Sequence, residues 1–150
     1  MPQSLSCILV HIIFSTKNRV PFIDASLEKE LHPYMSSIFN TLGCPARALN
    51  GTMDHVHILC SMSRTRTIAD VVEEAKTGSS KWAKTKGPQY RKFYWQKGYG
   101  AFSIGASGER DLKEYIARQK EKHVRKTFQD EFRSFLKLYN VPYDEKFVWE

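Results

Sequence analysis

The chain has few cysteines, and their pattern excludes two common kinds of structure. Only three of its 150 residues are cysteine, and no two of them form a CxxC pair. A disulfide framework needs cysteines in pairs, and a cysteine-ligated zinc site needs them closely spaced. We therefore expect Cys7, Cys44 and Cys60 to be reduced thiols.

Long hydrophobic runs are lacking as well. The longest apolar stretch, residues 5–14, is about half as long as the roughly 20 residues of a membrane span, and it contains Ser6 and His11. No Lys or Arg precedes it, so it also lacks the charged start of a secretory signal peptide. We expect a cytoplasmic protein without a membrane partner.

Acidic residues are outnumbered, with 16 Asp and Glu against 23 Lys and Arg, which gives a net charge of +7. An excess of positive charge favours an anionic partner, and nucleic acid is the leading candidate. The length suits one domain with a sizeable core.

The basic residues are densest from Lys76 to Lys97, where no acidic residue occurs. Tryptophan and tyrosine side chains lie between these cations, and single-stranded nucleic acid binds to such surfaces through its phosphates and unstacked bases. The alternative is a solvated basic face whose aromatic residues belong to the core. From the clustering of charge we predict four DNA-binding residues, Lys76, Lys81, Lys84 and Arg91.

Hydrophobic periodicity predicts the order strand, helix, strand, strand, helix, strand, then a helix and a helical tail. The expected elements are a strand at 5–14, a helix capped near Asp24 or Ser26, a hairpin of 46–50 and 55–62, a helix capped by Thr67, a strand within 93–104, a helix from Glu109 and a tail at 127–150. This order fits a ferredoxin-like α+β fold, an antiparallel sheet with helices on one face.

Three local details complete this prediction. Pro33 is expected to kink the first helix or to delay its start to about His32. The pair Asn50-Gly51 is expected to form the hairpin turn. The amphipathic tail is expected to be a docking or dimer surface rather than part of a site.

The stretch MDHVHIL, residues 53–59, contains two histidines one residue apart. Side chains alternate between the faces of a strand, so His55 and His57 should point the same way. Two neutral imidazoles side by side provide half of a metal site. The alternative is a strand whose outer face carries two polar residues.

A second polar pair lies on the helix expected after Glu109. Tyr115 and Gln119 share one helical face with Leu112, Ile116 and His123. A buried glutamine on this face would need a partner, although Gln119 could also reach water at a half-covered helix edge. Two imidazoles and an amide oxygen can hold a divalent ion, beside which a tyrosine hydroxyl could attack phosphorus.

With these residues in place, the sequence resembles the HUH single-tyrosine transposases of small insertion sequences and their REP-associated relatives. The resemblance extends from the opening strand and STKNR, through MDHVHIL and FYWQKGYGAFSIG, to EYIARQKEKH and EFRSFLKLYNVPYDEKFVW. It implies one transposase domain over residues 1–150, with Tyr115 as nucleophile and with His55, His57 and Gln119 as ligands of Mg²⁺ or Mn²⁺. Family helices commonly carry two adjacent histidines after the glutamine, whereas this chain has Lys122 and His123 there.

The resemblance also implies a reaction and an assembly. The enzyme would cleave and rejoin single-stranded DNA with hairpin ends through a 5′-phosphotyrosine intermediate. It would act as a homodimer whose sheets join, with each active site shared between subunits. The competing interpretations are a non-catalytic ferredoxin-like module that binds nucleic acid and a related HUH nickase or phosphodiesterase.

Overall fold

The computed structural model describes residues 2–150. Its strands are β1 (Leu9–Ser15), β2 (Ala46–Gly51), β3 (His55–Ser61) and β4 (Gly100–Ile104). Its α-helices are α1 (Ala25–Thr41), α2 (Ile68–Lys84), α3 (Glu109–Ala117), α4 (Gln119–Lys122) and α5 (Phe128–Leu138). Three 3-10 turns are η1 (Lys17–Arg19), η2 (Pro88–Tyr90) and η3 (Ala106–Gly108). None of the helices among these residues is long and apolar enough to cross a membrane.

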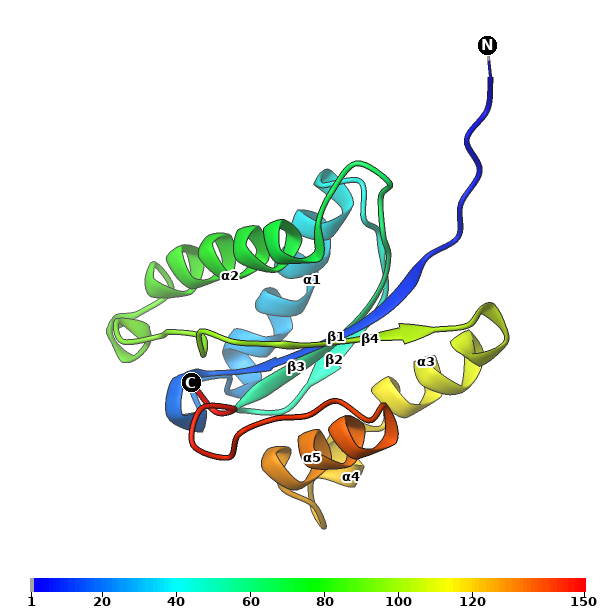
Figure 1. Cartoon of the computed structure of the whole chain (residues 1–150). Coiled ribbons are helices and arrows are strands. Elements are labelled where there is room, and N and C mark those ends of the chain that lie inside the picture. Colours follow the sequence, from blue (N-terminus) through cyan, green and yellow to red (C-terminus); the bar gives the residue numbers. More distant parts are fainter. Residues whose placement is uncertain (1) are drawn as a thin grey trace.

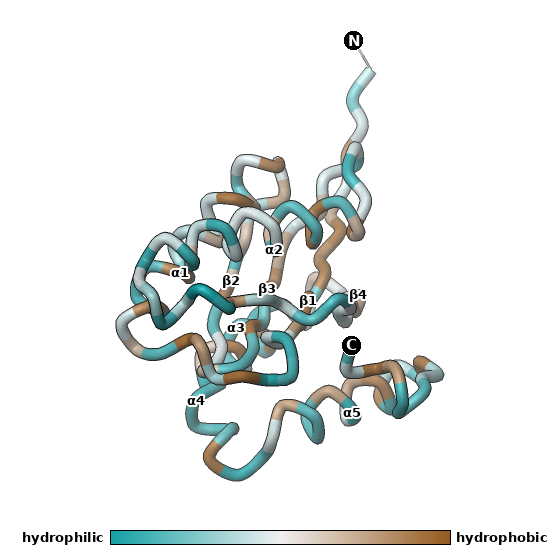
Figure 2. Tube along the Cα trace, turned by 90° about the vertical axis from the view of Figure 1, so that its left-hand side faces the viewer, coloured by the Kyte–Doolittle hydropathy of each residue, from teal (hydrophilic) through white to brown (hydrophobic). Residues whose placement is uncertain are grey.

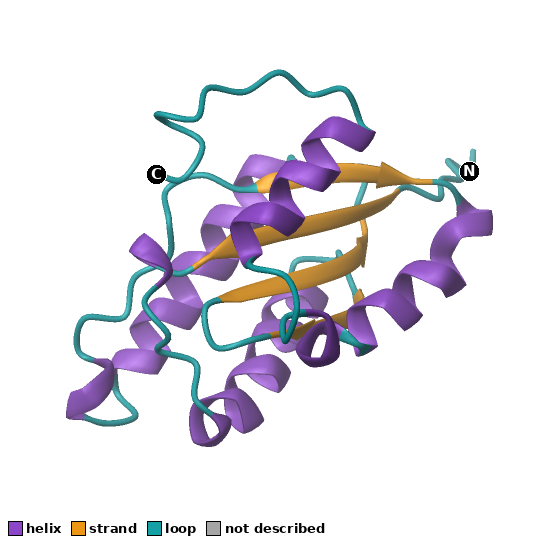
Figure 3. Cartoon of the chain, turned by 90° about the horizontal axis from the view of Figure 1, so that it is seen from below, coloured by secondary structure: helices purple, strands orange, loops and turns teal. Residues whose placement is uncertain are grey.

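The four strands form one antiparallel sheet in the order β2-β3-β1-β4 (Figure 3). The central strand β1 is buried along its whole length, because β3 and β4 flank it and helices cover both of its faces. Two β-α-β units in succession produce this arrangement. The predicted ferredoxin-like fold class is confirmed.

The two faces of the sheet pack against different helices (Figures 1 and 2). Val10, Ile12 and Phe14 of β1 belong to the core beneath α1 and α2. The alternate residues Leu9 and Ile13 pack against α3 and α5 on the opposite face. Helices thus cover both faces of the sheet rather than the one face predicted, because β1 carries buried side chains on both faces.

The helix boundaries follow from capping residues. Asp24 caps α1 by accepting a hydrogen bond of 2.8 Å from the backbone N–H of Leu27. The helix continues through Pro33 to Thr41, so the predicted alternative of a start near His32 is wrong. Thr67 caps α2 as predicted, since its side chain accepts a hydrogen bond from the N–H of Asp70.

The turn between β2 and β3 lies later than predicted. Gly51 still pairs with Val56, and the chain reverses over residues 52–54, where the Thr52 N–H donates to the His55 carbonyl. A Cβ at position 51 would lie 2.1 Å from that same carbonyl oxygen, so this close approach requires glycine. The prediction of an Asn50-Gly51 turn is wrong, because Gly51 serves the strand pairing.

The predicted tail contains α5, which packs on the chain's own sheet. Phe128, Phe132 and Leu136 form a cluster with Ile13 and Phe102. The helix approaches β4 so closely that a Cβ at position 100 would lie 2.5 Å from the Phe132 ring. The apolar face of α5 therefore packs against the chain's own sheet. The sequence had predicted that this face would be a docking or dimer surface.

Candidate active site and metal centre

His55 and His57 of β3 point to the same face of the sheet, as predicted. Val56 between them packs into the core beneath α1 and α2. Both imidazoles are fully buried, with 0% of each residue exposed. The alternative of a solvated outer face is therefore wrong, and the two buried rings need polar partners.

The Nδ1 atom of each imidazole has such a partner. His55 Nδ1 lies 2.7 Å from Oδ1 of Asp54 and 2.9 Å from the hydroxyl oxygen of Thr52. His57 Nδ1 lies 2.8 Å from Nε2 of His11 in β1. Partners at Nδ1 fix the orientation of a ring and leave Nε2 as the ligand atom.

Tyr115 and Gln119 come to the same place from α3 and α4. The Tyr115 ring centre lies 5.9 Å from that of His57, and the side chain is half-buried. Gln119 is fully buried, and its Oε1 lies 3.1 Å from His55 Nε2, so it does not reach water. The helix predicted to carry both is interrupted at Arg118, where α3 ends.

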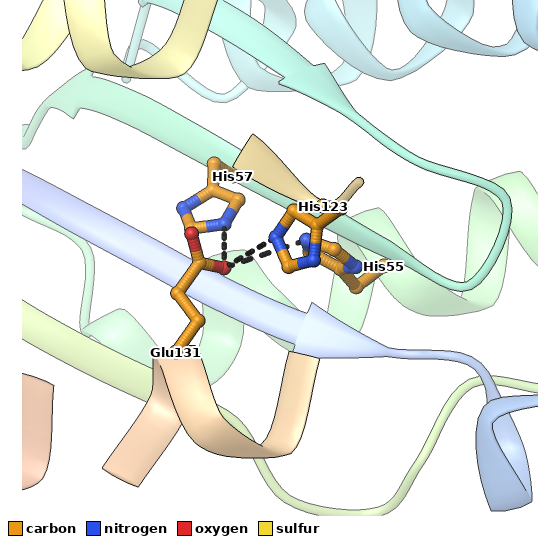
Figure 4. A group of neighbouring side chains, drawn as sticks. All are labelled: His55, His57, His123 and Glu131. Carbon is orange, nitrogen blue, oxygen red and sulfur yellow. Dashed lines mark hydrogen bonds and ion pairs between the residues drawn. The ribbon is translucent and has the colours of Figure 1, made fainter. Parts of the chain in front are cut away.

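Glu131 of α5 connects all of these groups. Its Oε1 lies 2.8 Å from Nε2 of His57 and 3.0 Å from Nε2 of His123 (Figure 4). Its Oε2 accepts hydrogen bonds from the hydroxyl of Tyr115 and, at 3.1 Å, from the amide of Gln119. One carboxylate therefore holds the proposed nucleophile and ligands together.

Sequence analysis did not identify Glu131, although a signal was present. The residue lies on the same helical face as Phe128, Phe132 and Phe135, where an apolar side chain is expected. It is only 2% exposed. A charged residue within an apolar stripe is the kind of signal that identified Gln119.

The protonation states follow from burial and hydrogen bonding. Burial favours the neutral form of His55, but hydrogen bonds to Asp54 and Glu131 outweigh it and raise the pKa of His55 to about 9. Complete burial lowers the pKa of His57 to about 4. Burial alone would raise the pKa of Glu131, yet its hydrogen bonds to three histidines hold it well below the usual range. At neutral pH the centre thus contains a cationic His55, a neutral His57 and an ionised Glu131.

The donor set fits a divalent metal ion. His55, His57, His123 and Glu131 each offer one atom, and these atoms all lie within 4.8 Å of one another. The amide oxygen of Gln119 is adjacent. Imidazole, amide and carboxylate donors are all common ligands of divalent ions.

A basic pocket leads from this centre to the surface. The pocket has a volume of about 800 Å³, and Tyr115 and Glu131 lie in its wall. Four cationic side chains and one further carboxylate also line it, namely Arg118, Lys122, Arg125, Lys126 and Glu121. Burial, followed by the hydrogen bond to Glu131, raises the pKa of Tyr115, so its phenol is protonated in a pocket suited to an anion.

The four cations predicted to bind DNA lie elsewhere, on α2 and beside η2. Lys76 donates to the backbone carbonyls of residues 96, 97 and 98 at 2.6–3.2 Å. Lys84 donates to the Phe93 carbonyl at 2.6 Å, whereas Lys81 and Arg91 are exposed. Lys76, Lys81 and Lys84 lie on α2, which covers the sheet face opposite α3 and α5 (Figure 1). The role of all four cations in DNA binding stays a prediction.

A family model described as "Transposase IS200 like" matches residues 4–119. The chain belongs to this family. The protein is therefore a transposase, an enzyme that acts on DNA, and the resemblance found in the sequence is confirmed. The matched segment of the transposase includes His55, His57, Tyr115 and Gln119, whereas Glu131 lies beyond it.

Solved structures share the fold of this transposase. One is a candidate transposase from Deinococcus radiodurans R1, with 21% identity and a TM-score of 0.62 over 79% of this chain and 98% of that chain. Another is a REP-associated tyrosine transposase bound to a REP hairpin, with 14% identity and a TM-score of 0.61 over 82% of this chain and 72% of that chain. No curated protein matches the sequence.

Proposed function

We propose that this transposase cleaves and rejoins single-stranded DNA at element ends through a 5′-phosphotyrosine intermediate. Tyr115 is the nucleophile, and His55, His57 and Gln119 hold a divalent ion, either Mg²⁺ or Mn²⁺. Residues 1–150 act as one transposase domain. The observation that carries the proposal is the convergence of a tyrosine hydroxyl, two imidazoles and an amide on one carboxylate in a basic pocket.

The chain's own residues account for the bond changes. The Tyr115 hydroxyl oxygen attacks the phosphorus, the bond from phosphorus to the 3′ oxygen breaks, and a free 3′ hydroxyl leaves. Glu131 Oε2 accepts the hydrogen bond of the Tyr115 hydroxyl and so orients its oxygen, and the proton that Tyr115 loses is balanced by the proton that the leaving 3′ oxygen gains. When bound, the divalent ion polarises the phosphate. The phosphotyrosine conserves the bond energy, so a second 3′ hydroxyl can attack it and reseal the strand.

The cationic wall of the pocket supports binding of the DNA backbone. Arg118, Lys122, Arg125 and Lys126 surround the approach to Tyr115, where the phosphate has to lie. The related REP-associated transposase binds a REP hairpin, so we propose a hairpin as the recognised feature here. Lys76, Lys81, Lys84 and Arg91 are proposed as contacts to DNA farther from the scissile bond.

The test is to incubate the full chain with divalent metal and labelled single-stranded DNA that carries hairpins from the element ends, and then to denature the mixture. Wild-type protein should form a covalent protein–DNA adduct, and Tyr115→Phe should form none, because it lacks the attacking oxygen. Tyr143→Phe is the matched control, since Tyr143 is an exposed tyrosine outside the site, and it should retain the adduct.

Two outcomes would contradict the proposal. Cleavage that persists in Tyr115→Phe would indicate a hydrolase that activates water. Binding without any adduct in the wild type, and without dependence on metal, would indicate a non-catalytic nucleic-acid module.

A further inference from the structure

Two residues beyond the proposed ligands face the same space. His123 follows α4 and Glu131 lies in α5, and both lie after residue 119, where the family match ends. With His55 and His57 they form a group of three imidazoles and one carboxylate drawn from three separate parts of the chain (Figure 4). Three of the four are buried, and His123 is partly buried.

The distances from Glu131 Oε1 to the three imidazoles are close to those between neighbouring ligands of one ion. Glu131 Oε1 lies 2.8 Å from Nε2 of His57, 3.0 Å from Nε2 of His123 and 3.5 Å from Nε2 of His55. An ion with bonds of about 2.1 Å holds neighbouring ligand atoms about 3.0–3.4 Å apart, depending on its geometry. An ion placed among these atoms would replace the protons that they now share, including the proton of His55.

Outer partners orient three of the four donors. Asp54 and His11 engage the Nδ1 atoms of His55 and His57. Tyr115 and Gln119 engage the second carboxylate oxygen of Glu131. Such outer partners fix the orientation of ligand side chains in protein metal sites.

We propose that His123 and Glu131 complete a metal centre with His55 and His57, and that this centre binds a first-row transition-metal dication such as Mn²⁺ or Zn²⁺ in preference to Mg²⁺. The inference rests on the proposed divalent site and extends its ligand set. Imidazole suits transition-metal ions, whereas Mg²⁺ favours oxygen ligands and retains several waters. Gln119 Oε1, 3.1 Å from His55 Nε2, is available as a fifth donor.

The competing arrangement is that the Glu131 carboxylate occupies the place of the ion and keeps it out. The two arrangements predict opposite effects of Glu131→Gln, a substitution that preserves shape and removes the charge. Removing a ligand weakens metal binding, whereas removing an obstruction strengthens it. The sign of the change in affinity therefore decides between them.

The experiment is calorimetric titration of the full chain, freed of metal with EDTA, with MnCl₂, ZnCl₂ and MgCl₂. Wild-type protein should bind Mn²⁺ and Zn²⁺ at least about tenfold more tightly than Mg²⁺. Glu131→Gln and His123→Gln should each weaken Mn²⁺ binding by about tenfold or more. Asp130→Asn, an exposed neighbour in α5, is the control and should bind as the wild type does.

Tighter or unchanged Mn²⁺ binding in Glu131→Gln would overturn the proposal, as would equal affinity of the wild type for Mg²⁺ and Mn²⁺. His123 is near the surface, so His123→Gln tests the ligand set even where Glu131→Gln fails to fold. Electron paramagnetic resonance of bound Mn²⁺ adds a direct readout, since His123→Gln should remove part of the imidazole nitrogen coupling. Glu131→Gln and His123→Gln report on metal affinity, whereas Tyr115→Phe reports on the DNA adduct, so this proposal and the proposed function fail separately.

Discussion

His55 and His57 are two residues apart in one strand, yet their surroundings make His55 cationic and His57 neutral at neutral pH. The hydrogen bonds of His55 to Asp54 and Glu131 raise its pKa to about 9, whereas burial lowers the pKa of His57 to about 4. A free histidine titrates near 6.5. Each shift links folding stability to pH, with opposite signs for the two residues.

The sign for His55 gives a testable pH dependence. Its folded pKa is raised, so its stabilising contribution is complete below about pH 6.5 and is lost as the pH rises towards 9. The free energy of unfolding of metal-free protein, measured by urea denaturation in EDTA, should therefore decline over this interval. In His55→Gln this decline should flatten, although the variant is less stable overall.

The matched control is His32→Gln. Burial lowers the pKa of His32 to about 4, so this residue affects stability only as the pH falls from about 6.5 to 4. The alkaline decline should thus be unchanged in His32→Gln. An alkaline decline as steep in His55→Gln as in the wild type would contradict the assignment.

Residue types and spacing were sufficient to predict that His55 and His57 share a face and that Gln119 is a polar residue on an apolar helical face; the roles of these residues stay predictions. Alternation along a strand placed His55 and His57 on one face, and a polar residue on an apolar helical face identified Gln119. Glu131 is also a polar residue on an apolar helical face, but it lies in the tail, and no sequence spacing links the tail to the histidines. Its proximity to them depends on how α5 docks on the sheet, which sequence periodicity does not specify.

At the scale of secondary-structure elements, the Asn50 side chain of β2 contacts the C-terminal end of α3. The last carbonyls of a helix have no partner within the helix. The Asn50 amide donates to the carbonyls of Ile116 at 2.9 Å and Ala117 at 3.3 Å, and Lys120 donates to the amide oxygen at 3.0 Å. Asn50 thereby holds the break between α3 and α4, which places Gln119 in the site.

We therefore predict that Asn50→Ala lowers the free energy of unfolding by about 1–2 kcal/mol, since helix-end carbonyls lose their donor. Hydrogen exchange at residues 116–123 should accelerate more than exchange in the sheet. Asn50→Asp, which keeps the size but not the donor, should behave similarly, and Asn40→Ala at an exposed position of α1 should be neutral. Uniform acceleration across the sheet would contradict a local role.

The errors in the predicted elements have local causes. Pro33 suggested a late helix start, but the Asp24 cap and the buried residues Leu31 and Met35 stabilise α1 across the proline. Asn50-Gly51 suggested a turn, but each residue serves a tertiary contact that becomes visible only in the assembled sheet. Capping residues and hydrophobic periodicity act within one element, so they predicted most elements correctly. Contacts between elements are not encoded in such local patterns.

For the whole molecule, the tyrosine of each site comes either from the chain that carries the histidines or from a second subunit. The family resemblance predicted a dimer in which the histidines of one subunit meet the tyrosine helix of the other. Within a single chain, Tyr115 already lies beside His57. The two arrangements differ in what happens when two inactive variants are mixed.

A mixing experiment with His55→Ala and Tyr115→Phe distinguishes them. A site built within one chain predicts no recovery of the covalent DNA adduct, because every site in a mixed assembly keeps one defect. Recovery to a substantial fraction of wild-type activity after co-refolding would show that the site is shared between subunits. Sedimentation of each variant alone should show that neither substitution changes the oligomeric state.

Gly100 leaves room for the Phe132 ring where α5 crosses β4, so a side chain there would act as a wedge. The wedge would displace the helix that carries Glu131 without changing the identity of any proposed ligand or of the nucleophile. A methyl group at position 100 would therefore change the distance between the Glu131 carboxylate and the histidines, although this position lies outside the site.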